Sequence, residues 1–190
     1  MTTSSKPDVW IALFRGINVG GNHILPMKDL RGLLSELGLI NVNTYIQSGN
    51  AVFQRAADST RTPNELAEQI AAAITTQHGF TPKVMVFSKT ALDDATNANP
   101  FPEAAHAPKT LYVYFLDTAP NSPDWQQLEA LKGASEHMKL VGNVFYLYAP
   151  DGISRSKLAA KAEKLLGVAA TARNWRTVCK LADLAEAVSG

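Results

Sequence analysis

The chain has 190 residues, of which 46% are hydrophobic and 18% are charged, and its formal net charge is +1. This composition is typical of a globular protein with a sizeable core, and no apolar run approaches the ~20 residues that span a bilayer. The lone cysteine, Cys179, excludes an intrachain disulfide framework and a cysteine-based metal site, and the polar N-terminal segment lacks a signal peptide, so we expect a cytoplasmic protein.

The first third of the chain predicts a strand, a helix and a hairpin. Residues 9–14 form a continuous apolar run, as in a strand covered on both faces. Apolar residues at helical spacing predict a helix that begins with Pro26 at its first position and ends at Gly38. Strands at 44–47 and 51–54 are expected on either side of a Gly-Asn turn.

A second helix and a fourth strand follow. Thr62, Pro63 and Glu65 make a capping box with proline at the first helical position, and His78-Gly79 ends the helix. Residues 83–87 are the next strand. The order β-α-β-β-α-β is that of the ferredoxin-like arrangement.

The same order is expected again after a short helix and a Pro-rich break at 99–108. The predicted elements are a strand at 111–116, a helix opened by residues 122–124, a hairpin of strands 138–141 and 144–148, a helix through Leu158 to Leu166, an extended piece at 168–173, and a last helix from Asn174. We therefore predict an α+β fold of two ferredoxin-like (βαββαβ) halves with antiparallel or mixed sheets, plus a C-terminal helix. The expected parts are 8–87, a connecting segment at 88–108, and 109–188.

A Gly-rich segment follows the first strand. Gly16 and Gly21 have the spacing of a phosphate-binding P-loop, but Asn22-His23 stands where Lys-Ser/Thr is required, which excludes a nucleotide hydrolase of that class. The glycines suit either a backbone that lies against a ligand or a connection that needs positive φ angles.

A second polar segment precedes the helix at 158–166. With Ser154 as the expected N-cap, Arg155 and Lys157 fall in the first helical turn, where the helix dipole disfavours cations. Free amides and two cations suit a phosphate or carboxylate, although both side chains could instead point into water. Arg173, just before the expected cap Asn174, is placed to reach the same anion.

The tyrosines, the basic residues and the histidines each bear on a further type of site. Tyr112 and Tyr114 share a face of one predicted strand, and Tyr146 and Tyr148 share a face of another. RNA-recognition domains stack bases on aromatic residues of the corresponding strands. The basic-glycine-aromatic signature of those domains is missing from this sequence. Residues 150–180 hold seven basic residues against two acidic ones. The four histidines are scattered without ligand spacing, so no metal site is expected.

Several segments together resemble a bacterial domain-of-unknown-function family, the one numbered 1697. They are Leu13–Gly21, Tyr45–Asn50, Asn99–Phe101, Pro150–Leu158 and Ala170–Trp175. The resemblance implies a two-part α+β fold related to the ferredoxin-like class, in small cytoplasmic proteins with no established activity.

The leading hypothesis is that an anionic small molecule, bearing phosphate or carboxylate, binds between the two halves. The residues expected to hold it are Arg15, Asn18, Gly20, Gly21, Ser48, Asn50, Ser156, Lys157, Arg173 and Asn174. The alternatives are single-stranded nucleic-acid binding through the basic segment and the tyrosines, and a structural or interaction module whose loops only pack the halves together. The sequence predicts no catalytic residue, metal, cofactor or membrane partner, and it leaves enzymatic activity and oligomeric state open.

Overall fold

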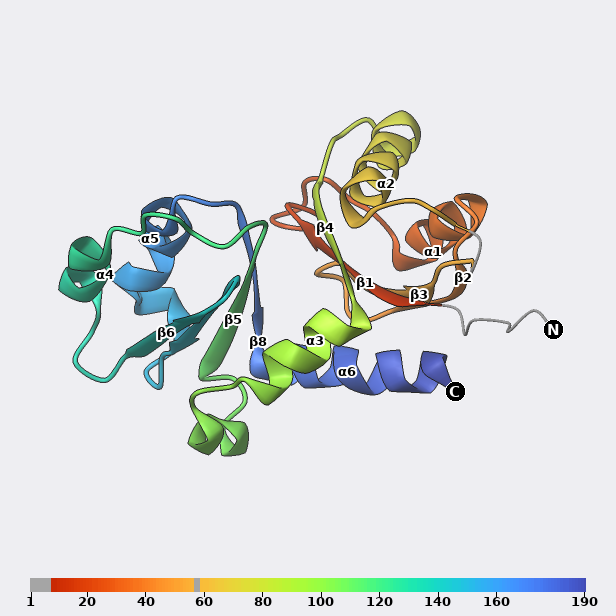
Figure 1. Ribbon diagram of the computed structural model, residues 1–190. Coiled ribbons are helices and arrows are strands. Elements are labelled where there is room, and N and C mark those ends of the chain that lie inside the picture. The colour runs from red at the N-terminus through yellow and green to blue at the C-terminus, as the bar shows by residue number, and fades with distance from the viewer. Residues whose placement is uncertain (1–7, 57–58) are drawn as a thin grey trace. The chain divides into compact units, whose positions relative to one another are not determined.

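The computed structural model describes residues 8–56 and 59–190, and each half of the predicted element order forms one four-stranded antiparallel sheet (Figure 1). In the first sheet the strand order is β2-β3-β1-β4. Its elements are β1 (Val9–Arg15), α1 (Met27–Glu36), β2 (Ile40–Thr44), β3 (Asn50–Gln54), α2 (Pro63–His78) and β4 (Lys83–Ser88). This is the ferredoxin-like topology, so the predicted fold of this half is confirmed.

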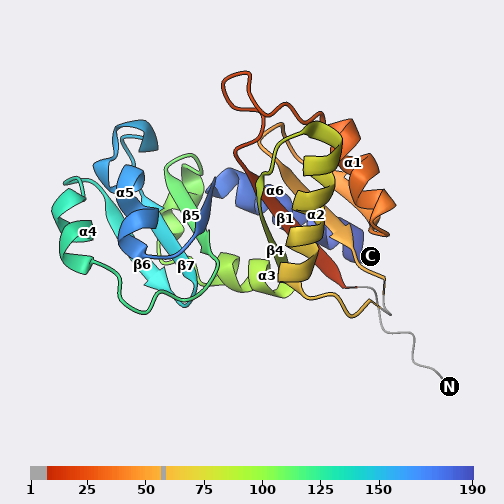
Figure 2. The same cartoon turned by 90° about the horizontal axis from the view of Figure 1, so that it is seen from above.

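One face of the first sheet is covered by α1 and α2 (Figures 1 and 2). Because side chains alternate along a strand, Trp10, Ala12 and Phe14 of β1 point to this face. They pack against leucines and isoleucines of both helices, among them Leu30 and Ile70. Each large side chain buried in this way contributes roughly 1.5–3 kcal/mol.

The second sheet repeats this arrangement with the strand order β6-β7-β5-β8. Its elements are β5 (Leu111–Leu116), α4 (Trp125–Leu131), β6 (His137–Val141), β7 (Val144–Tyr148), α5 (Lys157–Leu166) and β8 (Ala170–Asn174). Tyr114 and Phe145 face the two helices, and they pack against Leu128 of α4 and Leu158 of α5. The second ferredoxin-like half is therefore also confirmed.

In the described part of the chain, four helical elements remain besides those of the two ferredoxin-like halves. They are α3 (Lys89–Asn97), the C-terminal helix α6 (Trp175–Ser189), and the short 3-10 helices η1 (Pro102–His106) and η2 (Ile153–Arg155). The chain divides into a first compact unit, which ends at Asp94 and also includes Lys180–Gly190, and a second unit, Ala95–Cys179. Across residues 8–56 and 59–190, none of the helices has both the length and the apolar character that crossing a membrane requires.

The first hairpin differs from its prediction, whereas the second agrees. Strand β2 ends at Thr44, so the expected strand at 44–47 is wrong, and residues 45–49 form the connection. Asn50 lies inside β3, where its fully buried side chain donates a hydrogen bond to the carbonyl of Tyr45 at 3.0 Å and closes the longer loop. The Gly142-Asn143 turn joins β6 to β7 as predicted, with Gly142 at φ 57°.

Two of the predicted helix starts are shifted, and one is confirmed. Pro26 is the N-cap of α1 and not its first residue. At α2 the capping box of Thr62 and Glu65 is present, with Pro63 at the first helical position. The hydrogen bonds from the backbone and side chain of Thr62 lower the pKa of Glu65. At α5 the cap is Ser156 and not Ser154, so Arg155 precedes the helix and does not belong to its first turn.

Candidate functional site

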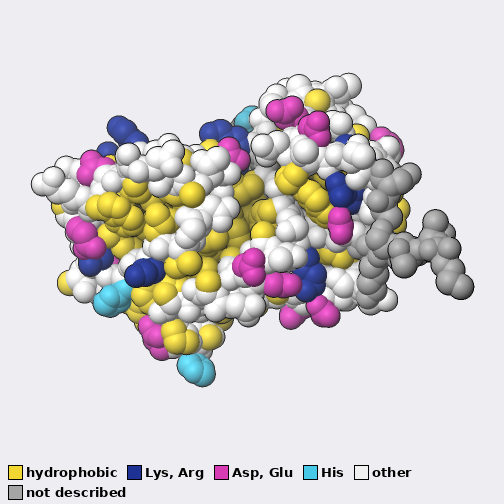
Figure 3. Space-filling view, in the orientation of Figure 1, with side chains coloured by type: hydrophobic (Ala, Val, Ile, Leu, Met, Phe, Trp, Pro, Cys, Tyr) yellow, Lys and Arg dark blue, Asp and Glu magenta, His cyan; other side chains and the backbone are white. Residues whose placement is uncertain are grey.

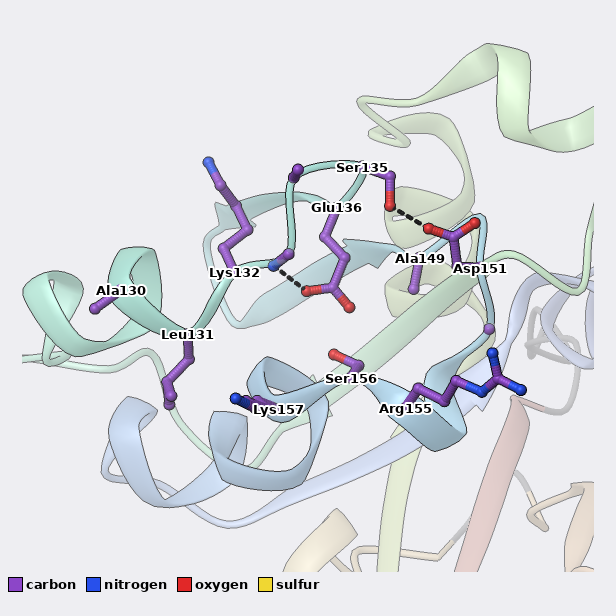
Figure 4. A pocket seen from close by; sticks show the side chains of 13 residues that line it. Ala130, Leu131, Lys132, Ser135, Glu136, Ala149, Asp151, Arg155, Ser156 and Lys157 are labelled. Carbon is purple, nitrogen blue, oxygen red and sulfur yellow. Dashed lines mark hydrogen bonds between the residues drawn. The ribbon is translucent and has the colours of Figure 1, made fainter.

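The second unit contains a pocket of about 780 Å³ beside the start of α5 (Figure 4). It is lined by residues 130–136, by Ala149, Asp151 and Gly152, and by residues 155–157. The first stretch is the end of α4 and the connection to β6, and the other two are the connection from β7 to α5. The α4–β6 connection and the β7–α5 connection of the second unit therefore meet around one hollow.

One wall of the pocket is the N-terminus of α5. Ser156 is largely buried, and its Oγ accepts a hydrogen bond from the amide of Ala159 at 2.9 Å. This leaves the amides of Lys157 and Leu158, the first two helical residues, without an acceptor inside the helix. Arg155 and Lys157 are exposed on either side of the cap. In the described part of the chain neither makes an ion pair.

The facing wall holds the carboxylate of Glu136, whose residue is only 7% exposed. Its Oε2 accepts a hydrogen bond from the amide of Gly133 at 2.7 Å, and the Glu136 amide donates to the Gly133 carbonyl at 3.0 Å. A Cβ at position 133 would lie 3.3 Å from that oxygen, so glycine allows the carboxylate to close over the turn. Figure 4 shows the Glu136 side chain pointing from this turn toward Ser156.

A second carboxylate and a third cation complete the polar lining. Asp151 accepts a hydrogen bond from the Ser135 hydroxyl at 2.6 Å. Lys132 is paired with Glu129 at 2.7 Å, and Glu129 is not among the lining residues. The pocket thus carries both signs of charge. Among the described residues, no group of three His, Cys, Asp or Glu side chains is arranged to hold a metal ion.

Of the ten residues predicted to bind a ligand, Ser156 and Lys157 line this pocket. Arg173 and Asn174 belong to the same unit but do not line it. Asn174 accepts a hydrogen bond from the Thr177 amide at 2.9 Å, which confirms it as the cap of α6. Arg173 donates to the carbonyl of Ala172 at 2.8 Å, and its burial lowers its pKa to about 10.

The other predicted residues lie in the first unit, where they organise the Gly-rich segment and the loop before β3. Gly20 and Gly21 have φ angles of 58° and 79°, and the Asn22 amide donates to the Val19 carbonyl at 3.0 Å. Two positive φ angles between these hydrogen-bonded residues are typical of a type I′ turn. The glycines therefore have a structural reason that does not depend on a ligand.

The polar side chains of this region hold backbone groups. Asn18 bonds to the backbone of Leu25 and of Gln47, and Asn50 donates to the Ser48 hydroxyl at 3.3 Å. Arg15 is the exposed last residue of β1.

Five charged or hydroxyl-bearing pocket residues were absent from the predicted set: Lys132, Ser135, Glu136, Asp151 and Arg155. Arg155 could have been found from the sequence, because its charge lies beside Lys157 near a helix start. No sequence pattern indicated Glu136, because a single acidic residue before a strand is typical of a solvated side chain. Only the turn with Gly133 brings it inward.

The tyrosines do not form one stacking surface. In the antiparallel register Val113 lies opposite Tyr146, so Tyr146 is on the face away from Tyr112 and Tyr114. Tyr146 is fully buried, and its hydroxyl donates to the carbonyl of Ala95 at 2.6 Å. On the face drawn in Figure 3, Lys and Arg side chains are dispersed among Asp and Glu. The nucleic-acid hypothesis therefore lacks the aromatic platform on which it was based.

The family model described as "Protein of unknown function (DUF1697)" matches residues 8–146, which is more than half of the chain. The chain belongs to this family. The match ends before Ser156, so the α5 wall of the pocket lies beyond the matched residues. Among solved structures, the chain is similar to the conserved bacterial protein SP0830 from Streptococcus pneumoniae, at 22% identity and a TM-score of 0.66 over 94% of this chain and 98% of that one. At this identity the likeness shows the fold alone. No curated protein matched the chain.

Proposed function

We propose that this DUF1697 protein binds a small molecule bearing a phosphate or carboxylate group, in the pocket at the start of α5. The observation that carries the proposal is that Arg155 and Lys157 flank the buried cap Ser156 at a hollow of about 780 Å³. Pockets of roughly 300–1,000 Å³ are typical of small-molecule sites.

The electrostatics of this wall favour an anion. A cation in the first turn of a helix is unfavourable by roughly 0.3–1 kcal/mol, and Lys157 occupies this turn, with Arg155 directly before the cap. No described carboxylate forms an ion pair with either Arg155 or Lys157. A bound anion would accept hydrogen bonds from both side chains and from the first amides of α5. Each hydrogen bond to a charged group contributes roughly 1.5–3 kcal/mol.

The test compares two double variants of the same helix region. Arg155→Ala/Lys157→Ala removes the pocket cations, and Lys161→Ala/Lys164→Ala removes the same charge from exposed positions of α5 that do not line the pocket. Thermal shift and calorimetry with inorganic phosphate and a panel of phosphorylated and carboxylated metabolites are expected to show binding by the wild type and by the Lys161/Lys164 variant. The Arg155/Lys157 variant should lose at least about tenfold in affinity. Equal affinities in all three proteins, or no binding by any, would refute the proposal.

A second candidate is a structural role for the Gly-rich segment and the loop at 45–49. It is favoured by the hydrogen bonds that Asn18 and Asn50 make to backbone groups. In that case substitutions there lower stability and leave ligand binding in the second unit unchanged. We also propose a cytoplasmic location, which a single cysteine favours.

A further inference from the structure

We infer, on the basis of the proposed anion binding, that the ligand of this pocket is a zwitterion that carries an ammonium group close to its phosphate or carboxylate. The cations at the start of α5 would hold the anionic group. The wall opposite them, formed by Glu136 and Asp151, would hold the ammonium group. This assigns the ligand class of the site, and it gives Glu136 a binding role.

Glu136 is the decisive residue, because it is only 7% exposed and, among the described residues, only one of its two carboxylate oxygens accepts a hydrogen bond. In the described part of the chain its only hydrogen-bond donor is the Gly133 amide, which contacts Oε2. No described cation forms an ion pair with it. An ionised carboxylate can accept about four hydrogen bonds, and the second oxygen of Glu136 is not among the buried unpartnered atoms, so it is accessible from the pocket. Glu136 therefore has acceptor capacity that the protein does not fill.

The nearby lysine does not supply the missing charge. Lys132 lines the same pocket, but its Nζ lies 2.7 Å from a carboxylate oxygen of Glu129. The Glu136 side chain closes the turn through the hydrogen bond that Oε2 accepts from Gly133. Closing the turn does not involve the other carboxylate oxygen, Oε1.

Asp151 strengthens the negative character of this wall. One of its oxygens accepts the Ser135 hydroxyl at 2.6 Å, which fixes the carboxylate at the rim of the pocket. Figure 4 shows Asp151 and Glu136 above the hollow as drawn, with Arg155, Ser156 and Lys157 below it. A ligand with a single charge would satisfy one wall and leave the other without a partner. A zwitterion satisfies both.

The experiment uses pairs of probes that differ in an amino group. They are O-phosphoethanolamine with ethyl phosphate, and β-alanine with propionate, and ethanolamine tests the ammonium alone. The proteins are the full chain, Glu136→Gln and Glu103→Gln. Glutamine keeps an acceptor for Gly133 and removes the charge, while Glu103 is an exposed carboxylate of the same unit outside the pocket.

Calorimetry is expected to show that the wild type and Glu103→Gln bind the amino member of a pair at least about tenfold more tightly than its partner. Glu136→Gln should lose this preference and keep its affinity for ethyl phosphate. If both members of each pair bind equally, or if Glu136→Gln retains the preference, the zwitterion inference is wrong and anion binding stands. If no phosphate or carboxylate probe binds at millimolar concentration, both proposals are wrong.

Discussion

The side-chain nitrogen of Asn18 donates a hydrogen bond to the backbone carbonyl of Gln47 at 2.8 Å, across 29 residues of sequence. The same nitrogen donates to the carbonyl of Leu25 at 2.9 Å, and Oδ1 accepts from the amide of Leu25 at 2.8 Å. One side chain therefore joins the two ends of the Gly-rich segment to each other and to the loop before β3. Asn18 also has φ 54°, a left-handed conformation that asparagine adopts more readily than most residues.

The first prediction is that Asn18→Asp destabilises the protein by about 1–3 kcal/mol. Aspartate has the same shape and tolerates the left-handed backbone, but it replaces the donor with an oxygen that faces two carbonyl oxygens. Chemical denaturation measures the loss. Asn22→Asp is the matched control, because within residues 8–56 and 59–190 the Asn22 side chain makes only a 3.5 Å contact, with the Gly20 carbonyl. We expect less than about 0.5 kcal/mol for this control. Equal stability of the two variants would contradict a structural role for Asn18.

The second prediction concerns Gly49, which has φ 77° and no space for a side chain. A Cβ there would lie 2.5 Å from Ile17 Cδ1 and 2.6 Å from Phe14 Cβ. Gly142 also has a positive φ, 57°, but a Cβ there would meet nothing within 4 Å. We expect Gly142→Ala to cost about 1–2 kcal/mol from the left-handed backbone alone. Gly49→Ala should cost at least about 1–3 kcal/mol more, because overpacking adds to the strain. Similar melting temperatures for the two variants would show that the contacts with Phe14 and Ile17 relax without cost.

The order of the elements could be predicted because its signals are local. Thr62, Pro63 and Glu65 fix the start of α2 within four residues of sequence, and Gly142-Asn143 sets the turn of the second hairpin. The prediction of the first hairpin was wrong because its decisive signal is not local. A polar residue such as Asn50 reads as part of a turn, whereas its burial and its hydrogen bond to Tyr45 make it the first residue of β3.

The pocket could be predicted only in part, for a similar reason. Arg155 and Lys157 stood out because cations beside a helix start conflict with the dipole, which is a local pattern, and Ser156 lies between them. Glu136 depends on a turn with Gly133 and on the approach of the β6 connection to α5, and spacing in the sequence reports neither of these. The Gly-rich segment shows the opposite case. Its glycines suggested a ligand-binding loop, but a turn explains their positive φ angles.

The third prediction separates capping from anion binding at Ser156. Ser156→Ala removes the acceptor for the Ala159 amide and is expected to cost about 0.5–2 kcal/mol. Ser156→Asp keeps a capping oxygen and places a negative charge where the helix dipole favours it, so its stability should stay within about 1 kcal/mol of the wild type. The same charge should abolish phosphate binding at this wall. Normal phosphate affinity in Ser156→Asp would mean that the anion does not sit at the start of α5.

The last prediction concerns the stability of the protein at alkaline pH. Burial raises the pKa of Tyr146 to about 12, and its hydroxyl donates to the Ala95 carbonyl. The unfolded chain loses this proton near pH 10 and the folded chain keeps it until about pH 12, so the contribution of Tyr146 is complete below pH 10 and falls between these values. Tyr146→Phe should therefore be less stable than the wild type by about 1–3 kcal/mol at pH 8. This difference in the free energy of unfolding between the wild type and Tyr146→Phe should narrow between pH 10 and pH 12. Tyr112 and Tyr114, whose pKa values burial also raises, are present in both proteins and cancel in the comparison. Urea unfolding at pH 8, 10, 11 and 12 measures the gap, and a gap independent of pH would show that Tyr146 does not retain its proton in the folded state.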